Sequence, residues 1–180
     1  MKYHFLTSNK DKFVEANNLF VEHSLKLNRI TKSYDEIQAD NLMDVVISAI
    51  KGIVKPGVFI EDSGLFINAL AGFPGVYSSY VYKTLGNVGI LKLLNNIDDR
   101  SAIFESVIAY KGKKEVKIFK GSVKGNISRK IKGSNGFGYD PIFIPLGYDE
   151  TFAENYAVKR GMSHRNASIT RLIGYLKEDL

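Results

Sequence analysis

The sequence predicts an α/β fold, because short β-type runs alternate with helical patterns and two of the runs form a hairpin signal. The chain has 180 residues, of which 44% are hydrophobic and 24% are charged, and this balance is typical of a folded globular protein rather than a disordered one. The length fits a single domain over residues 1–180. The strands and hairpins do not follow a regular βαβ repeat.

The first part of the chain alternates between strands and capped helices. Tyr3–Thr7 is a short β-type run, after which Ser8 or Asn9 can cap a helix that reaches to about residue 25. A second strand is predicted over residues 26–31. Asp40 or Asn41 can cap the next helix, which we expect to continue to Val54, where Pro56-Gly57 follows and stops it.

The central part begins with the buried-type strand 58–60, which is expected to end in Glu61-Asp62, and the chain continues extended over residues 65–70. Residues 72–75 form a Gly- and Pro-containing turn, and a helical stretch interrupted near Gly86 runs to Leu94. The hairpin pairs residues 101–110 with 115–123 around Lys111-Gly112-Lys113. A short apolar run over residues 141–145 and a last helix, capped by Ser163 and running from His164 to about Lys177, complete the chain.

The charge balance and the missing cysteines limit the possible functions. The net charge is +6, with 25 basic and 19 acidic residues, so the protein attracts anions: nucleic acid, acidic lipid or nucleoside phosphates. Basic residues gather between Lys111 and Lys132, and we interpret them as the solvated face of the hairpin, because Phe119 is almost the only aromatic residue among them. No cysteine is present, which excludes disulfides and thiolate metal sites. With no apolar run long enough to span a membrane, we expect a soluble, cytoplasmic protein.

The segment from Gly133 to Arg165 is the strongest indication of a binding site. Phe137 and Tyr139 alternate around Gly138, so that two rings can present their faces to a planar group. The cationic donors Lys159, His164 and Arg165 follow a short distance downstream. Backbone that can approach a ligand, flat aromatic rings and cations together suit a nucleotide.

Two further segments carry groups that suit phosphate chemistry. Glu61 and Asp62 follow an apolar strand, and carboxylates at such a position can hold Mg²⁺ together with substrate phosphates; the alternative is a solvated turn. The segment from Thr7 to Lys12 opens the first helix, where free N–H groups and the helix dipole favour an anion; the alternative is simple capping. This segment is not a Walker motif.

Six motifs follow one another over nearly the whole chain. They are Thr7-x-Asn9-x-x-Lys12, Glu61-Asp62-Ser63-Gly64-Leu65, residues 72–78, residues 136–143, Thr151-Phe152-Ala153-Glu154 and Ser163-His164-Arg165. This ordered set resembles the inosine/xanthosine triphosphate pyrophosphatase (Ham1-like) family. The resemblance implies a long mixed sheet with flanking helices, two lobes around a nucleotide-binding cleft and a homodimer. It also implies Mg²⁺-dependent hydrolysis of ITP, dITP and XTP to the monophosphate and pyrophosphate.

The resemblance also assigns roles to single residues. The metal site is expected from Glu36 and Asp62, with Asp62 also activating water and Glu61 assisting it. Ser79 departs from the family, where many relatives carry a basic residue. The expected substrate contacts are Thr7, Asn9, Lys12 and Ser63, with Phe137, Tyr139, Asp140, Lys159, His164 and Arg165 around the base.

Three other functions remain open at this point. A Maf-like nucleotide pyrophosphatase would have a similar architecture, although residues 137–140 and 163–165 argue against it. A basic nucleic-acid-binding module is supported by the isoelectric point of about 9.3, and it would bind polynucleotides without turnover. A nucleotide sensor would bind ITP and leave it intact.

Overall fold

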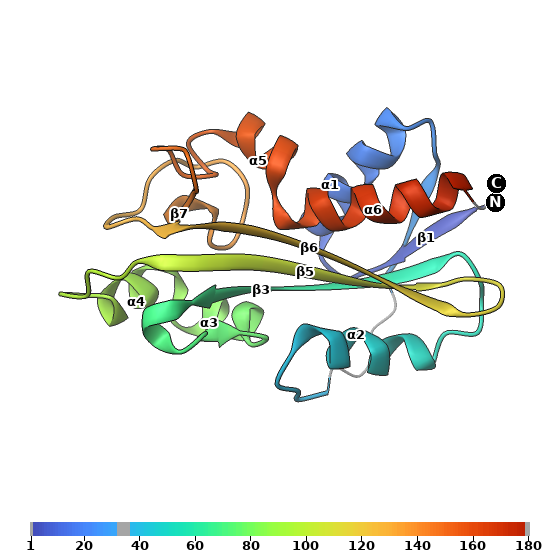
Figure 1. Cartoon of the computed structure of the whole chain (residues 1–180), viewed down its shortest axis with the longest axis horizontal. Coiled ribbons are helices and arrows are strands. Elements are labelled where there is room, and N and C mark those ends of the chain that lie inside the picture. Colours follow the sequence, from blue (N-terminus) through green and yellow to red (C-terminus); the bar gives the residue numbers. More distant parts are fainter. Residues whose placement is uncertain (1, 32–36, 179–180) are drawn as a thin grey trace. The chain divides into compact units, whose positions relative to one another are not determined.

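The computed structural model describes residues 2–31 and 37–178, and it confirms the predicted α/β class. A seven-stranded sheet has the order β2-β1-β3-β5-β6-β7, and β4 pairs with β3 beside this path (Figure 1). The elements are β1 (Tyr3–Leu6), α1 (Lys10–Glu22), β2 (Leu27–Ile30), α2 (Leu42–Lys51), β3 (Val58–Ile67), β4 (Pro74–Gly75), α3 (Ser78–Thr84), α4 (Gly86–Leu93), β5 (Ser101–Lys111), β6 (Val116–Ile127), β7 (Phe143–Pro145), α5 (Tyr156–Met162) and α6 (His164–Glu178), with short 3₁₀ helices at Asn68–Leu70 and Asp140–Ile142.

The chain divides into two compact units, and β3, β5 and β6 each pass from one unit into the other along their length. Unit 1 contains residues 1–62, 106–121 and 164–180, and unit 2 contains residues 63–105 and 122–163. Each unit has its own cluster of buried apolar side chains. The boundary within β3 falls between Asp62 and Ser63.

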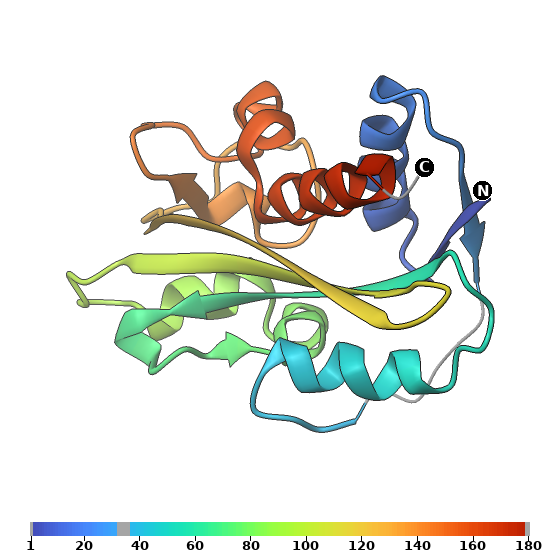
Figure 2. The same cartoon turned by 45° about the vertical axis from the view of Figure 1, so that its right-hand side comes forward.

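Unit 1 is built around β1, which pairs in parallel with both β2 and β3. Helices α1 and α6 lie on one face of these strands and α2 lies on the other (Figures 1 and 2). The core contains the stacked rings of Phe5, Phe20 and Phe59, which are all fully buried. Apolar residues at helical spacing in α6, among them Ile169, Leu172 and Ile173, close this core.

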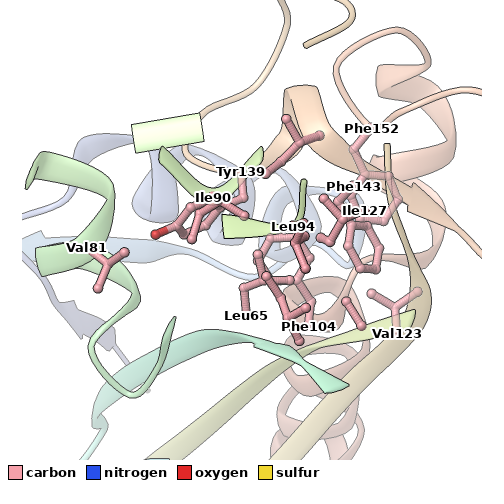
Figure 3. Packing of buried hydrophobic residues seen from close by; sticks show 13 residues of the cluster. Leu65, Val81, Ile90, Leu94, Phe104, Val123, Ile127, Tyr139, Phe143 and Phe152 are labelled. Carbon is pink, nitrogen blue, oxygen red and sulfur yellow. The ribbon is translucent and has the colours of Figure 1, made fainter. Parts of the chain in front are cut away.

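Unit 2 has a second core, in which side chains from β3, β5 and β6 meet those of α4 and of the segment around β7. Figure 3 shows this cluster, in which the Phe143 ring packs against the rings of both Phe104 and Phe152. Strand β7 pairs antiparallel with β6, and Ile127 lies opposite Phe143. Tyr139 is part of the same cluster, which fixes its ring within the packed interior.

The main differences from the predicted elements lie in β3 and before α6. Strand β3 does not end at Asp62 but continues to Ile67. The continuation is possible because Gly64 lies against the backbone of β4, where a Cβ atom would come within 2.4 Å of the Gly75 carbonyl oxygen. Helix α2 ends at Lys51 rather than Val54, with Gly52 as its cap. Helix α5 was not predicted, since its short length gives little periodicity.

The basic hairpin residues lie on the surface, as predicted: Lys113, Lys114, Lys120 and Lys124 are exposed. The Phe119 ring is partly buried in the core of unit 1 and lies 5.6 Å from the Tyr175 ring, so it does not extend the basic face. None of the helices in the described part of the chain is long and apolar enough to cross a membrane.

The close packing of β6 against α6 leads to a prediction about two glycines of unit 1. A Cβ atom on Gly121 would come within 2.1 Å of the His164 carbonyl oxygen and 2.4 Å of the Ser168 nitrogen, both of which are backbone atoms that cannot rotate away. We expect Gly121→Ala to destabilise the protein by about 1–3 kcal/mol in urea unfolding. Gly174→Ala, on α6 with open space around it, is the matched control and should stabilise by up to about 1 kcal/mol. Equal stability of the two variants would contradict the close approach.

Candidate active site

The loop between β1 and α1 forms the first part of the site, in unit 1. The side-chain oxygen of Asn9 caps α1 by accepting hydrogen bonds from the backbone N–H groups of Asp11 and Lys12, at 2.9 and 3.1 Å. The Thr7 hydroxyl oxygen accepts from the Asn9 N–H at 3.1 Å. Among residues 2–31 and 37–178, the Asn9 Nδ2 group has no hydrogen-bond partner, so it remains a donor beside the positive end of the helix.

Lys12 connects this loop to the two acids of β3. Its Nζ lies 3.0 Å from Glu61 Oε2 and 3.7 Å from Asp62 Oδ1. The Glu61 side chain is fully buried, whereas 23% of the Asp62 side chain is exposed. The two acids therefore share one cation but differ in their access to solvent, as adjacent residues of a strand usually do.

Glu61 is the centre of a buried hydrogen-bonded network. Arg165 Nη2 lies 3.2 Å from Glu61 Oε1, and the Ser106 hydroxyl donates to the same oxygen at 2.8 Å. Burial by itself raises the pKa of Glu61, but the positive charges of Arg165 and Lys12 outweigh it and bring the pKa to about 2. Glu61 is therefore ionised at neutral pH, and its low pKa makes it a weak proton acceptor.

Arg165 also binds a second acid. Its Nη1 lies 2.6 Å from Glu15 Oε2, and only 2% of the Arg165 side chain is exposed. Burial lowers the pKa of Arg165, but the carboxylates of Glu61 and Glu15 outweigh this and hold the pKa above its ordinary value. The guanidinium thus joins α6 to α1 and β3 through charged hydrogen bonds, which are stronger than neutral ones.

The charges of unit 1 are suited to a divalent cation. Three carboxylates, from Glu15, Glu61 and Asp62, face the two cations Lys12 and Arg165, so these five side chains together carry one negative charge. Asp62 is the most exposed of these three carboxylates. Mg²⁺ is commonly bound by one or two carboxylates together with substrate phosphates, so this arrangement fits the ion. The described residues contain no group of three or more acidic, His or Cys side chains that could hold a metal by themselves, and Glu36 lies outside the described residues.

A second polar cluster lies in unit 2, around Asp140. Its Oδ2 atom accepts from the Lys159 Nζ at 2.6 Å and from the Phe137 N–H at 2.7 Å. The Lys159 Nζ also lies 4.4 Å from the centre of the Phe137 ring. Gly136 has a φ of +76°, and a Cβ atom there would come within 2.2 Å of Asp140 Oδ2, so this turn requires glycine.

The loop that carries Phe137 is fixed to the neighbouring helices of unit 2. The Tyr139 hydroxyl donates to the Ser78 carbonyl oxygen at 2.9 Å, and Asn87 Nδ2 donates to the Gly138 carbonyl oxygen at 3.1 Å. Burial, followed by the neighbouring Tyr82, raises the pKa of Tyr139, so its hydroxyl stays protonated as a donor. Phe137 is half-buried and Tyr139 is buried, which makes Phe137 the more accessible of the two predicted rings.

The structure brings most of the predicted site residues into two clusters, one in each unit. His164 is buried at the first position of α6, and Ser63 is partly buried in β3. Sequence analysis missed Glu15, Ser106 and Asn87. Glu15 lies one turn after Lys12 on the same helix, so helical spacing could have indicated it, whereas nothing local marks Ser106 or Asn87. Unit 1 holds Thr7, Asn9, Lys12, Glu61, Asp62, His164 and Arg165, and unit 2 holds Ser63, Phe137, Tyr139, Asp140 and Lys159.

The buried pair of Lys159 and Asp140 should be important for stability. Lys159→Met leaves the Asp140 carboxylate buried without its cation, and we expect a loss of about 3–5 kcal/mol in the free energy of unfolding. The control is Lys132→Met, because Lys132 Nζ lies 3.9 Å from Glu154 Oε2 in a pair whose side chains are 32% and 30% exposed; its loss should stay below about 1 kcal/mol. Urea unfolding of both variants measures the difference, and similar losses would argue against a buried pair.

Comparison with known proteins identifies the family. The sequence profile of the Ham1 family matches residues 3–175. The chain is 47% identical to a dITP/XTP pyrophosphatase of Thermococcus kodakarensis, over 100% of both chains. It is 46% identical to a dITP/XTP pyrophosphatase of Pyrococcus horikoshii, over 100% of this chain and 99% of the relative. The solved structure of the Ham1 protein from Staphylococcus aureus superimposes with a TM-score of 0.84, at 31% identity and with both chains fully covered. The chain therefore belongs to the Ham1 family.

Proposed function

We propose that this protein is a nucleoside triphosphate pyrophosphatase that hydrolyses non-standard purine nucleoside triphosphates, such as ITP, dITP and XTP, to the monophosphate and pyrophosphate with Mg²⁺. Membership of the Ham1 family supports the reaction class, and relatives over the full length of the chain carry the name dITP/XTP pyrophosphatase. For this chain the proposal depends on the contacts of Lys12, which connect the N-terminal end of α1 to Glu61 and Asp62. An anion site and a carboxylate are thereby next to each other.

The phosphates bind at the β1–α1 loop. The Nδ2 group of Asn9 offers a hydrogen-bond donor to a polyanion, and the Lys12 ammonium and the N-terminal end of α1 offer positive charge. Thr7 holds the Asn9 backbone in place through its hydroxyl. A bound triphosphate competes with Asp62 for Lys12, which frees the Asp62 carboxylate for the metal and the water.

Asp62 carries the reaction. Its carboxylate and that of Glu36 would hold Mg²⁺, and a bound ion would neutralise phosphate charge and stabilise the leaving pyrophosphate. Asp62 orients the water and takes up its proton as the oxygen attacks the α-phosphorus. The bond from the α-phosphorus to the bridging oxygen breaks, and pyrophosphate leaves with that oxygen.

Glu61 has a supporting role in this proposal. Its carboxylate is enclosed by Arg165, Ser106 and Lys12, and its pKa of about 2 is far too low for efficient proton uptake near neutral pH. It therefore holds Lys12 in position for the phosphates rather than activating the water.

The purine binds beside Phe137, whose half-buried ring can stack on a base. Lys159 Nζ lies over this ring, and Asp140 binds both Lys159 and the Phe137 N–H. Hypoxanthine and xanthine present O6 as an acceptor, whereas adenine presents an amino group, so donors in the pocket discriminate between them. His164 and Arg165 are the further proposed donors, and a base that binds Arg165 has to compete with Glu15 and Glu61 for the guanidinium.

The family resemblance further implies a cytoplasmic homodimer. Exposed apolar and aromatic side chains on α3, on α4 and at the residue between them suit a face between two copies, since such surfaces are unfavourable in water. These side chains are Tyr80, Tyr82, Leu85, Val88 and Leu93.

The reaction can be tested with a panel of nucleoside triphosphates. With Mg²⁺, ITP and XTP should be converted to monophosphate and pyrophosphate, and ATP should react roughly tenfold to over a hundredfold more slowly, as expected for one mismatched hydrogen bond. Chelation with EDTA should stop turnover, and added Mg²⁺ should restore it. Phosphorus NMR of the products separates the alternatives, because release of orthophosphate and a nucleoside diphosphate would place the attack at the γ-phosphorus and refute the proposal.

The role of Asp62 can be tested by Asp62→Asn, which keeps the shape of the side chain and removes its charge. We expect kcat for ITP to fall by about 10²- to 10⁴-fold with little change in the unfolding midpoint. Asp98→Asn is a matched control, because the Asp98 side chain is fully exposed and should not affect turnover. If Asp62→Asn hydrolysed ITP at the wild-type rate, Asp62 would be only a strand residue that pairs with Lys12.

A further inference from the structure

Arg29 on β2 binds the backbone of the loop that opens α1. Its Nε donates to the Thr7 carbonyl oxygen at 3.1 Å, and its Nη2 donates to the Ser8 carbonyl oxygen. All of these residues belong to unit 1. Arg29 belongs to none of the sequence motifs. Among the described residues its guanidinium makes no ion pair with an acid, and its side-chain hydrogen bonds go to the backbone of this loop.

These two bonds fix the direction of two consecutive peptide units. In a planar trans peptide the C=O and N–H groups point in opposite directions. Because the Thr7 carbonyl points to Arg29, the Ser8 N–H points away from it, and the same holds for the Asn9 N–H, which donates to the Thr7 hydroxyl oxygen at 3.1 Å. Within the described residues the Ser8 N–H has no hydrogen-bond partner.

The guanidinium also changes the charge that the loop presents. Two carbonyl oxygens carry partial negative charge and would repel a phosphate, but here both are bound by the cationic guanidinium of Arg29. With these two oxygens occupied, the loop offers the Ser8 N–H to an anion. Pairing of the Thr7 N–H with the Ile30 carbonyl oxygen at 3.0 Å holds this loop and the end of β2 together.

We propose that Arg29 is a positioning residue for the substrate phosphates, which keeps the carbonyl oxygens of Thr7 and Ser8 turned away from the polyanion and aims the Ser8 N–H at it. This inference rests on the proposed function, because it takes the β1–α1 loop as the phosphate site. It adds a residue outside the family motifs and a backbone donor to that site. Arg29 acts through the loop and does not itself react.

The experiment compares Arg29→Gln and Arg29→Lys with Arg171→Gln. Arg171 is an exposed arginine of unit 1 whose Nη1 donates to the Lys120 carbonyl oxygen at 2.6 Å, so the control loses the same charge and the same kind of bond elsewhere. Calorimetry with Mg²⁺ and tripolyphosphate measures phosphate binding without turnover, and calorimetry with inosine measures binding of the nucleoside. Steady-state kinetics with ITP give KM and kcat.

For Arg29→Gln we expect the dissociation constant of tripolyphosphate and the KM for ITP to rise by about tenfold, the loss typical of a charged hydrogen bond. Arg29→Lys keeps the positive charge but loses the planar guanidinium that binds two oxygens at once. Its tripolyphosphate dissociation constant and its KM for ITP should therefore lie between those of wild type and Arg29→Gln. Inosine binding, the unfolding midpoint and the Arg171→Gln control should stay close to wild type.

Unchanged tripolyphosphate binding in Arg29→Gln would overturn the inference, and so would an equal loss of tripolyphosphate and inosine binding, which indicates a general loosening of the fold. A wild-type protein that binds tripolyphosphate but leaves ITP intact would instead refute the proposed function. In that case the comparison of tripolyphosphate affinities still decides the role of Arg29.

Discussion

The buried carboxylate of Glu61 is the group on which the arrangement of unit 1 depends. A charged group without contact to water is costly unless it is fully paired, and Glu61 is paired by Arg165 from α6, by Lys12 from α1 and by the hydroxyl of Ser106 from β5. Each partner comes from a different element, so the requirements of one carboxylate fix two helices and two strands. Asp62, the next residue of the chain, is thereby held at the position where solvent reaches it.

Unit 2 also contains a buried carboxylate that is paired with a cation. The Asp140 carboxylate binds Lys159 and the backbone of Phe137, and the cation in turn lies against the Phe137 ring. In both units a buried acid therefore holds a cation and a segment that is available to a ligand. Such pairs add little net stability compared with an apolar core, but they define a single arrangement of the groups around them. Precise positioning is what a site for a charged, planar substrate needs.

The sequence was sufficient for the fold class and for most of the elements, because caps and periodicity are local signals. Asn9 and Asn41 cap α1 and α2 as predicted. The end of β3 was predicted wrongly, because the close contact of Gly64 with Gly75 depends on residues that are distant in the sequence. Likewise, the motifs indicated Arg165 as a residue of the site, but its pairing with Glu15 spans 150 positions of the chain and has no local pattern. Arg29 was missed for a related reason, since an arginine that binds backbone carbonyl oxygens leaves no motif.

The two ends of the Asn9 side chain have separate tasks. Its oxygen accepts the hydrogen bonds that begin α1, while its nitrogen is the donor that we propose for the phosphates. Where deamidation converts this asparagine to aspartate, the new side chain can accept the same two bonds. The aged molecule would therefore remain folded, and its helix would remain capped. A donor to the polyanion would, however, have become a negative charge that repels it. Exchange of one nitrogen for one oxygen can thus silence this protein without unfolding it, and a population that appears intact by its structure can contain inactive molecules.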